Sequence, residues 1–222
     1  MKYLVATFNI ETSADLMQAC QDLLADGAAE AGFESFEETE TGMEAYVQKD
    51  LFDKEALDAF SYRGLVYESA DFHNAVFVGT DREGNPRHIH KRSTAAQGGF
   101  KGNAPGSEPE YSFHWVGGGD TLFLFEAPID MLSFISMHKQ HWKSSSYAAA
   151  CGVSDKVLWK TMEGRPFIRN VCICLDNDET GQKAAQRISK ALTEKNIRNQ
   201  ILVPARKDWN EDLLFLRKED RK

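Results

Sequence analysis

The sequence lacks the patterns of a membrane, secreted or zinc-binding protein. None of its apolar runs approaches the roughly 20 residues that a membrane-spanning helix requires, and we find no signal-peptide pattern. Its four cysteines are Cys20, Cys151, Cys172 and Cys174, and they show neither zinc-ligand spacing nor a disulfide framework. We therefore expect reduced core thiols in a cytoplasmic protein that does not engage membranes.

Arginine is absent from the first 60 residues. This stretch contains three lysines and 14 acidic residues, which gives it a net charge of about −11. The remainder holds 23 basic and 20 acidic residues, about +3, within a total of −8. This asymmetry predicts two regions with different partners. Only the second region has a charge that suits contact with a nucleic-acid backbone.

A β-branched, apolar run at residues 171–175 ends at two carboxylates, Asp176 and Asp178, and Gly181 then precedes a helical pattern. This pattern predicts a buried strand that delivers its carboxylates to the edge where open α/β sheets place their sites. Side chains at i and i+2 there can reach one crevice and hold a hard cation such as Mg²⁺. A polar loop with an acidic helix start explains the same residues equally well.

Two further strands repeat this arrangement. The run at 121–125 ends at Glu126, with Asp130 in the first turn of the next helix, and the run at 147–150 leads to Gly152. Helical patterns at 129–139, 154–162 and 180–195 separate these strands from one another and from a strand at 199–203. The alternation predicts an α/β fold with a Rossmann-like parallel sheet, flanked by helices and built with right-handed crossovers.

These motifs resemble the Toprim domain, which topoisomerases, bacterial primases and related nucleases share. The resemblance covers roughly residues 117–215, and three motifs occur in its order and spacing. A fourth stretch, residues 207–212, resembles the lysine-aspartate-x-asparagine-aspartate motif of primase-like members, with one residue inserted before the last aspartate. The matching positions are Glu126, Asp130, Gly152, Asp176, Asp178, Gly181, Asp208 and Asn210.

The resemblance implies roles for these residues. Asp176 and Asp178 would hold Mg²⁺, or Mn²⁺ in its place, and Glu126 would be a third ligand or the general acid/base. Because neighbouring carboxylates resist joint ionisation, the pKa of Glu126 should be raised, which suits a proton donor. Trp209 is more typical of a packing residue than of a base-stacking platform. The remaining motif residues, Asp130, Gly152, Gly181, Asp208 and Asn210, would support the site.

The implied function is Mg²⁺-dependent action on the phosphodiesters of single-stranded or primed DNA or RNA. The chemistry is primase-like nucleotidyl transfer or strand cleavage, in replication or mobilisation of a mobile element alongside other replication or mobilisation proteins. A non-catalytic DNA-binding or recombination-mediator module with the same fold is the alternative. No tyrosine is marked as a topoisomerase nucleophile.

Residues 1–60 predict an α+β segment of the ferredoxin-like type, with the order βαββα. We expect a strand at 2–10, a helix from near Ala14, a hairpin at 33–48 and a helix through Phe60. The sequence of residues 26–48 resembles the amino-terminal substrate-recognition domain of methyltransferases that modify a large-subunit ribosomal protein. No strand leads into an acidic Gly-x-Gly loop downstream, so we expect a fusion without a methyl-donor site.

Residues 61–116 predict a β-rich domain with a hairpin turn at 81–85. It resembles a domain of unassigned function that precedes Toprim in proteins of bacterial mobile elements. The predicted domains are therefore 1–60, 61–116 and 117–222.

The most basic stretch lies in this β-rich region. Lys91, Arg92 and Lys101 lie near the aromatic Phe100, and basic groups beside a flexible loop suit phosphate contact. The alternative is a solvated edge hairpin, in which lysine prevents edge-to-edge pairing.

Overall fold

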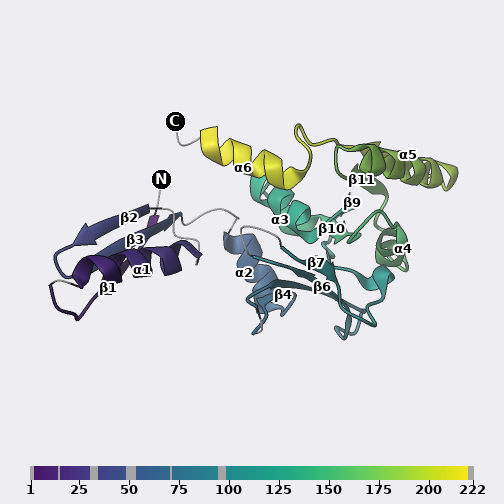
Figure 1. The fold of residues 1–222 in the computed structure, drawn as a ribbon. Coiled ribbons are helices and arrows are strands. Elements are labelled where there is room, and N and C mark those ends of the chain that lie inside the picture. Colours follow the sequence, from purple (N-terminus) through teal and green to yellow (C-terminus); the bar gives the residue numbers. More distant parts are fainter. Residues whose placement is uncertain are drawn as a thin grey trace. The chain divides into compact units, whose positions relative to one another are not determined.

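A computed structural model describes residues 3–14, 16–30, 35–48, 54–70, 72–94 and 99–219 (Figure 1). The described chain divides into two compact units. One contains the residues up to Gln48, and the other contains the residues from Lys54 onward. No helix in these described ranges combines the length and the apolar character that crossing a membrane would need.

The first unit has the predicted βαββ order. The strands form an antiparallel sheet in the order β1-β3-β2, with β3 in the centre. Its elements are β1 (Tyr3–Asn9), α1 (Met17–Glu30), β2 (Ser35–Thr39) and β3 (Gly42–Gln48).

The helix of this unit differs from the sequence prediction. It begins at Met17, three residues later than expected. The side chains of Leu16 and Leu23 are 52% and 78% exposed. Leu24, in contrast, packs on the small core around Met43. The sheet has just three strands, so it offers the helix a narrow apolar surface.

The helix α2 (Lys54–Tyr62) lies in the second unit, although we predicted that it completes the amino-terminal segment. Phe60 is fully buried there, and its ring lies 5.1 Å from Phe113 and 5.7 Å from Trp142. Burying a phenylalanine side chain contributes roughly 1.5–3 kcal/mol, so the helix belongs with the unit that supplies this aromatic core.

The β-rich part of the second unit is a four-stranded antiparallel sheet in the order β4-β5-β6-β7. The predicted turn at 81–85 is present, and the Asp81 carboxylate accepts hydrogen bonds from the backbone of Glu83 and Asn85. The elements are β4 (Val66–Glu68), β5 (Ala75–Thr80), β6 (Pro86–Arg92), β7 (Lys101–Asn103) and the 3₁₀ helix η1 (Pro109–Tyr111).

A five-stranded sheet in the order β12-β11-β9-β10-β8 forms the rest of the unit. Four strands are parallel, which confirms the predicted α/β class, and the short β8 pairs antiparallel with β10. The strand β8 was not predicted, because two residues carry no periodic pattern. The strands are β8 (His114–Trp115), β9 (Thr121–Phe125), β10 (Ser146–Ala149), β11 (Asn170–Cys174) and β12 (Arg198–Ile201). The helices are α3 (Pro128–Met137), η2 (Trp142–Ser144), α4 (Lys156–Met162), α5 (Glu179–Glu194) and α6 (Trp209–Glu219).

Two apolar cores cover the two faces of this sheet. Alternate residues of β11 divide between them: Cys172 and Cys174 enter one core, while Val171 and Ile173 enter the other. The first core contains α3 and Trp209 of α6, which lie next to each other in Figure 1, and the second contains α4 and α5. All four cysteines are free thiols. This layering leaves the carboxyl ends of the parallel strands at one edge.

Candidate functional site

The carboxyl ends of β9 and β11 bring Glu126 and Asp176 together. Phe125 pairs with Cys174 across these neighbouring strands, so Glu126 lies opposite Leu175, one residue before Asp176. One oxygen of each carboxylate, Oε2 of Glu126 and Oδ1 of Asp176, is buried without a hydrogen-bond partner within the described part of the chain. Unpartnered buried carboxylate oxygens are costly, and their pairing here marks a place for a ligand.

Two glycines shape the backbone around these carboxylates. The N–H of Gly152 donates to the carbonyl of Glu126, 3.1 Å away, and Gly152 has a φ of 139°. A Cβ on Gly181 would lie 2.4 Å from the carbonyl oxygen of Asp176, so only glycine allows this approach. The N–H of Gly181 donates to Oδ1 of Asp178, which caps α5. Both glycines therefore lie where the resemblance placed them.

Asp130 joins the same edge from α3. Its side chain is 4% exposed, and its Oδ1 accepts the backbone N–H of Asn210 at 3.2 Å. The Asn210 side chain in turn accepts a hydrogen bond from Ser133. Asp130 and Asn210 thus connect α3 to the start of α6. This contact holds the buried carboxyl group of Asp130 close to the other carboxyl groups.

The loop before α6 brings Lys207 and Asp208 to the edge. The Lys207 carbonyl accepts the N–H of Asn177 at 2.7 Å, so the loop is fastened to the segment between Asp176 and Asp178. Asp208 caps α6 by accepting the N–H of Glu211. Trp209 is 8% exposed and donates its indole N–H to the Cys174 carbonyl, which confirms the prediction of a packing role.

Electrostatics show that these carboxylates form one group. Burial, then the charges of Asp130 and Glu126, raise the pKa of Asp176 to about 7. Burial and then Asp208 raise the pKa of Asp130 to about 7. The pKa of Glu126 is also raised, first by burial and then by Asp178. A cluster that resists full ionisation is a favourable environment for a cation and for a carboxylic acid that transfers protons.

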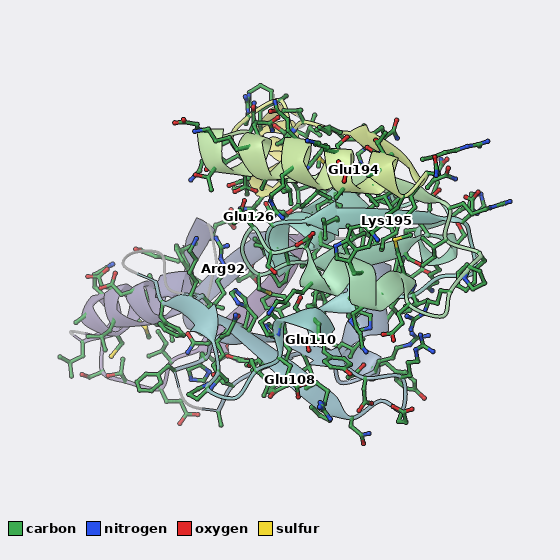
Figure 2. The ribbon with its side chains drawn as sticks, turned by 90° about the vertical axis from the view of Figure 1, so that its right-hand side faces the viewer. Arg92, Glu108, Glu110, Glu126, Glu194 and Lys195 are labelled. Atoms are coloured by element: carbon green, nitrogen blue, oxygen red, sulfur yellow. The ribbon has the colours of Figure 1, made fainter. Side chains whose placement is uncertain are left out.

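Cations of the β-rich sheet face this acidic group. Arg92 and Lys101 pair across β6 and β7, and they act on Asp130 and Glu126 respectively. Figure 2 labels Arg92 and Glu126 close together, in agreement with the influence of both on Asp130. Lys91 neighbours Arg92 in sequence and so points to the opposite face of the sheet. The three predicted nucleic-acid contacts therefore do not share one surface.

The donor set at this edge suits Mg²⁺ or Mn²⁺. Asp176 and Glu126 supply hard, unpartnered oxygen atoms, and Mg²⁺ is commonly held by one or two carboxylates with water and substrate phosphate completing its shell. Among the described residues, however, no group of three or more His, Cys, Asp or Glu side chains is arranged to hold a metal ion. The residues thus fit a two-carboxylate site better than a complete protein cage.

Three further residues contribute to this edge, although the sequence assigned none of them a role in the site. Lys207 acts on Glu126, and Asn177 fastens the loop that carries Lys207. The Asp212 carboxylate accepts the N–H groups of Ala205 and Arg206, which holds the same loop from α6. Lys207 and Asp212 stand at the ends of the 207–212 motif, so the motif itself contained the signal for them.

Comparison with known proteins agrees with this architecture. Residues 123–213 match the family model described as Toprim-like, and residues 48–120 match a family described as a protein of unknown function, DUF3991. An uncharacterised Bacillus anthracis protein, pXO2-78, is 25% identical over 181 residues, which are 74% of this chain and 52% of that protein. The chain thus spans about half the length of that relative.

The amino-terminal segment has a separate similarity. A ribosomal protein L11 methyltransferase of Phocaeicola vulgatus is 47% identical over 57 residues. These residues make up 26% of this chain and only 19% of the methyltransferase. The similarity is consistent with the predicted resemblance and leaves most of that enzyme without a counterpart here.

Solved structures show the fold. The primase fragment of the bacteriophage T7 primase-helicase is 18% identical, with a TM-score of 0.54, and the match covers 74% of this chain and 67% of that one. A T7 primase domain seen with a lagging-strand polymerase, an RNA/DNA hybrid and dTTP gives 20% identity and a TM-score of 0.53, over 77% and 83% of the two chains. At 18–20% identity these structures show a fold shared with primase domains, and the Toprim-like model matches residues 123–213 of it.

Proposed function

We propose that this protein is a Mg²⁺-dependent enzyme that acts on phosphodiesters of DNA or RNA, by primase-like nucleotidyl transfer or by strand cleavage. The observation that carries the proposal is the group of five carboxylates at one edge of a Toprim-like sheet, with unpartnered oxygens on Glu126 and Asp176. The resemblance of the two later domains to mobile-element proteins supports a role in replication or mobilisation of such an element.

In this proposal Asp176 and the oxygen of Asp178 that does not cap α5 would hold Mg²⁺ or Mn²⁺, with Glu126 as a third ligand or as the general acid. The bound metal would offset the charge that develops on the phosphate. Burial, followed by the charge of Asp178, raises the pKa of Glu126, which suits a group that donates a proton to the leaving oxygen. Arg92, Lys101 and Lys207 balance the acidic group and attract the polyanionic substrate.

The test uses Asp176→Asn, which removes the proposed ligand and keeps its size. Mg²⁺ should raise the Tm of the wild type by mass action and leave that of the variant unchanged. Without metal the variant should melt at a higher temperature than the wild type, because it loses a buried like charge. Asp120→Asn, at the opposite edge of the sheet, should behave as the wild type.

Activity is then measured on labelled single-stranded and primed DNA with nucleotides and Mg²⁺ or Mn²⁺. Primer extension or synthesis supports nucleotidyl transfer, and shortened strands support cleavage. Wild type that binds Mg²⁺ but yields neither product would contradict the proposed catalysis.

A non-catalytic nucleic-acid-binding or recombination-mediator module is the second candidate. It is favoured by the absence of a three-ligand group in the described residues and by the engagement of Asp178 and Asp208 as helix caps. We further propose that residues 1–60 are a fused segment without methyl-transfer activity, which binding of a methyl donor in calorimetry would contradict.

A further inference from the structure

The face of the β-rich sheet that points away from Arg92 carries a row of aromatic and basic side chains. Register places Tyr67 of β4, Val76 of β5, Lys91 of β6 and Gly102 of β7 side by side in this order. Residues that pair directly across neighbouring strands point to the same face. The row therefore crosses the full width of the sheet, from one edge strand to the other.

An exposed ring occupies each end of the row. Tyr67 is 48% exposed at the β4 end. At the β7 end, a Cβ on Gly102 would lie 3.1–4.0 Å from three ring atoms of Phe100, so the Phe100 ring lies over Gly102 on this face. Phe100 is nevertheless 59% exposed. Gly102 leaves space for this ring, which keeps one aromatic surface toward solvent.

The centre of the row consists of the buried apolar side chain of Val76 and the basic side chain of Lys91 beside it. Val76 is 1% exposed, so it forms a floor between the two rings. Lys91 is half-buried, and no ion pair is found for it within the described ranges. An aliphatic stem along the floor with its ammonium group in water is the usual disposition of such a lysine. Two aromatic surfaces with one free cation between them match the alternating bases and phosphates of a nucleic-acid strand.

The row and the candidate site are associated with opposite faces of the same sheet. The adjacent row consists of Glu68, Ala75, Arg92 and Lys101 and points to the opposite face, where Arg92 and Lys101 act on the acidic group. A further ring, Phe72, is 88% exposed at the same end of the sheet, where the Thr94 hydroxyl donates to the carbonyl of His73. Exposure of this large apolar ring to water does not stabilise the fold. The backbone of Phe72 also has a φ of 65°, which is uncommon for a bulky residue.

We propose that this face, with Tyr67 and Phe100 as stacking surfaces and Lys91 between them, binds unpaired bases of single-stranded DNA. The inference rests on the proposed action on nucleic acid and adds a path for the strand outside the acidic edge. Stacking is tolerant of sequence because every base has a flat apolar face, so we expect binding without strong base preference.

Binding is measured by fluorescence anisotropy with a labelled oligothymidylate of about 20 nucleotides, in EDTA and without nucleotides. Tyr67→Leu and Phe100→Leu should each weaken binding roughly 5- to 150-fold, the range that loss of one stacked base produces. Tyr62→Leu is the matched control, because Tyr62 is 94% exposed at the end of α2 and outside the row. Phe100→Tyr should restore affinity, which a general loss of folding would not allow.

A direct readout follows from cross-linking. Light-activated 5-iodouracil in the oligonucleotide should attach to Tyr67 or Phe100, identified by peptide mapping, and duplex DNA of equal length should not react there. Leucine variants that bind like the wild type, or cross-links confined to other residues, would overturn the proposal.

The two proposals fail separately. Synthesis or cleavage by a wild type whose face variants bind normally would remove this inference and leave the catalytic proposal intact. If the face variants lose binding and the wild type shows no catalysis with any metal, the inference about this face stands and the catalytic proposal fails.

Discussion

The carboxyl groups at the sheet edge differ in their surroundings, and this difference assigns their roles. Asp178 and Asp208 each accept a backbone N–H as helix caps, so one oxygen of each already has a partner. Glu126 and Asp176 keep a buried oxygen without a partner in the described residues, and both have a raised pKa. The latter pair is therefore the part of the group that a ligand or a proton would satisfy.

Glu126→Gln separates proton transfer from metal binding. If Glu126 is the general acid, the variant should lose roughly 10²–10⁴ in rate and should keep the Mg²⁺-dependent rise in Tm. Both are measured on the same preparation, by product formation and by thermal melting. The exposed carboxylate Glu179, paired with Lys183 at 2.5 Å, offers Glu179→Gln as a control with full activity. Loss of the Mg²⁺ response in Glu126→Gln would instead make Glu126 a metal ligand.

His88 should make the stability of the fold depend on pH. Its ring is 1% exposed, neither nitrogen has a partner in the described part, and burial followed by the charge of His90 lowers its pKa to about 4. The unfolded chain protonates near pH 6.5 and the folded chain only near pH 4, so stability is complete above about pH 6.5 and falls between these values.

Urea unfolding of the wild type and His88→Phe at several pH values measures this effect. The free energy of unfolding of the wild type should fall relative to that of the variant by up to about 3 kcal/mol between pH 7 and pH 4. The contributions of the other titrating groups to the free energy of unfolding cancel in this comparison, because both proteins contain them. Parallel curves for the two proteins would show that His88 does not titrate on unfolding.

At the scale of elements, the approach of α5 to the end of β11 determines where Asp176 and Asp178 lie. Gly181 lets the first turn of α5 pass directly over the Asp176 carbonyl. The Asp178 cap then fixes the same turn. The loop before α6 is fastened to this segment through Asn177 and held from α6 by Asp212. The close approach of Gly181 and these hydrogen bonds therefore place side chains that are far apart in the sequence.

Gly181→Ala tests this close approach. Alanine gains about 1 kcal/mol in helix propensity, but its Cβ would lie 2.4 Å from a backbone oxygen that cannot rotate away. Overpacking costs about 1–3 kcal/mol, so we expect a net loss of stability and a weaker Mg²⁺ response. Thermal melting with and without Mg²⁺ measures both quantities.

Gly118→Ala is the control for that experiment, since a Cβ there meets nothing within 4 Å. It should leave both the Tm and the Mg²⁺ response unchanged. Equal behaviour of the two alanine variants would contradict a role for Gly181 in positioning Asp176.

At the scale of the whole molecule, the aromatic core of the second unit begins with α2. Ala56 and Phe60 are buried in the same core as Phe113 and Trp115. The composition changes near residue 60, and a domain boundary there would cut through the packed helix α2. The structure instead divides the chain into its two units before Lys54. The three domains predicted from the sequence stay a prediction, with this displaced boundary.

Two truncations distinguish these boundaries. Deletion of residues 1–51 should leave the main thermal transition unchanged, because it removes only the first unit. Deletion of residues 1–60 should lower the free energy of unfolding by about 3–5 kcal/mol, since the Phe60 side chain leaves the core. Calorimetry of the two proteins measures the difference. Equal transitions would place α2 outside the cooperative unit.

The sequence alone determined the α/β class, the strand ends that carry Glu126 and Asp176, and the glycines at 152 and 181. These features are local, because strand periodicity and a terminal carboxylate or glycine occupy one continuous stretch. The packing role of Trp209 was also predictable, since a motif of charged residues with one apolar member indicates its buried side.

Only the tertiary structure decided which side chains share a surface. Lys91 points to the opposite face from Arg92 and Lys101, and Lys207 lies near enough to act on Glu126. The helix α2 belongs to the second unit, and the Phe100 ring lies over Gly102. These outcomes depend on pairing register, on backbone approach and on burial against residues distant in the chain. Such long-range contacts leave no periodic signal in the sequence, so the fold must bring them together before they can be seen.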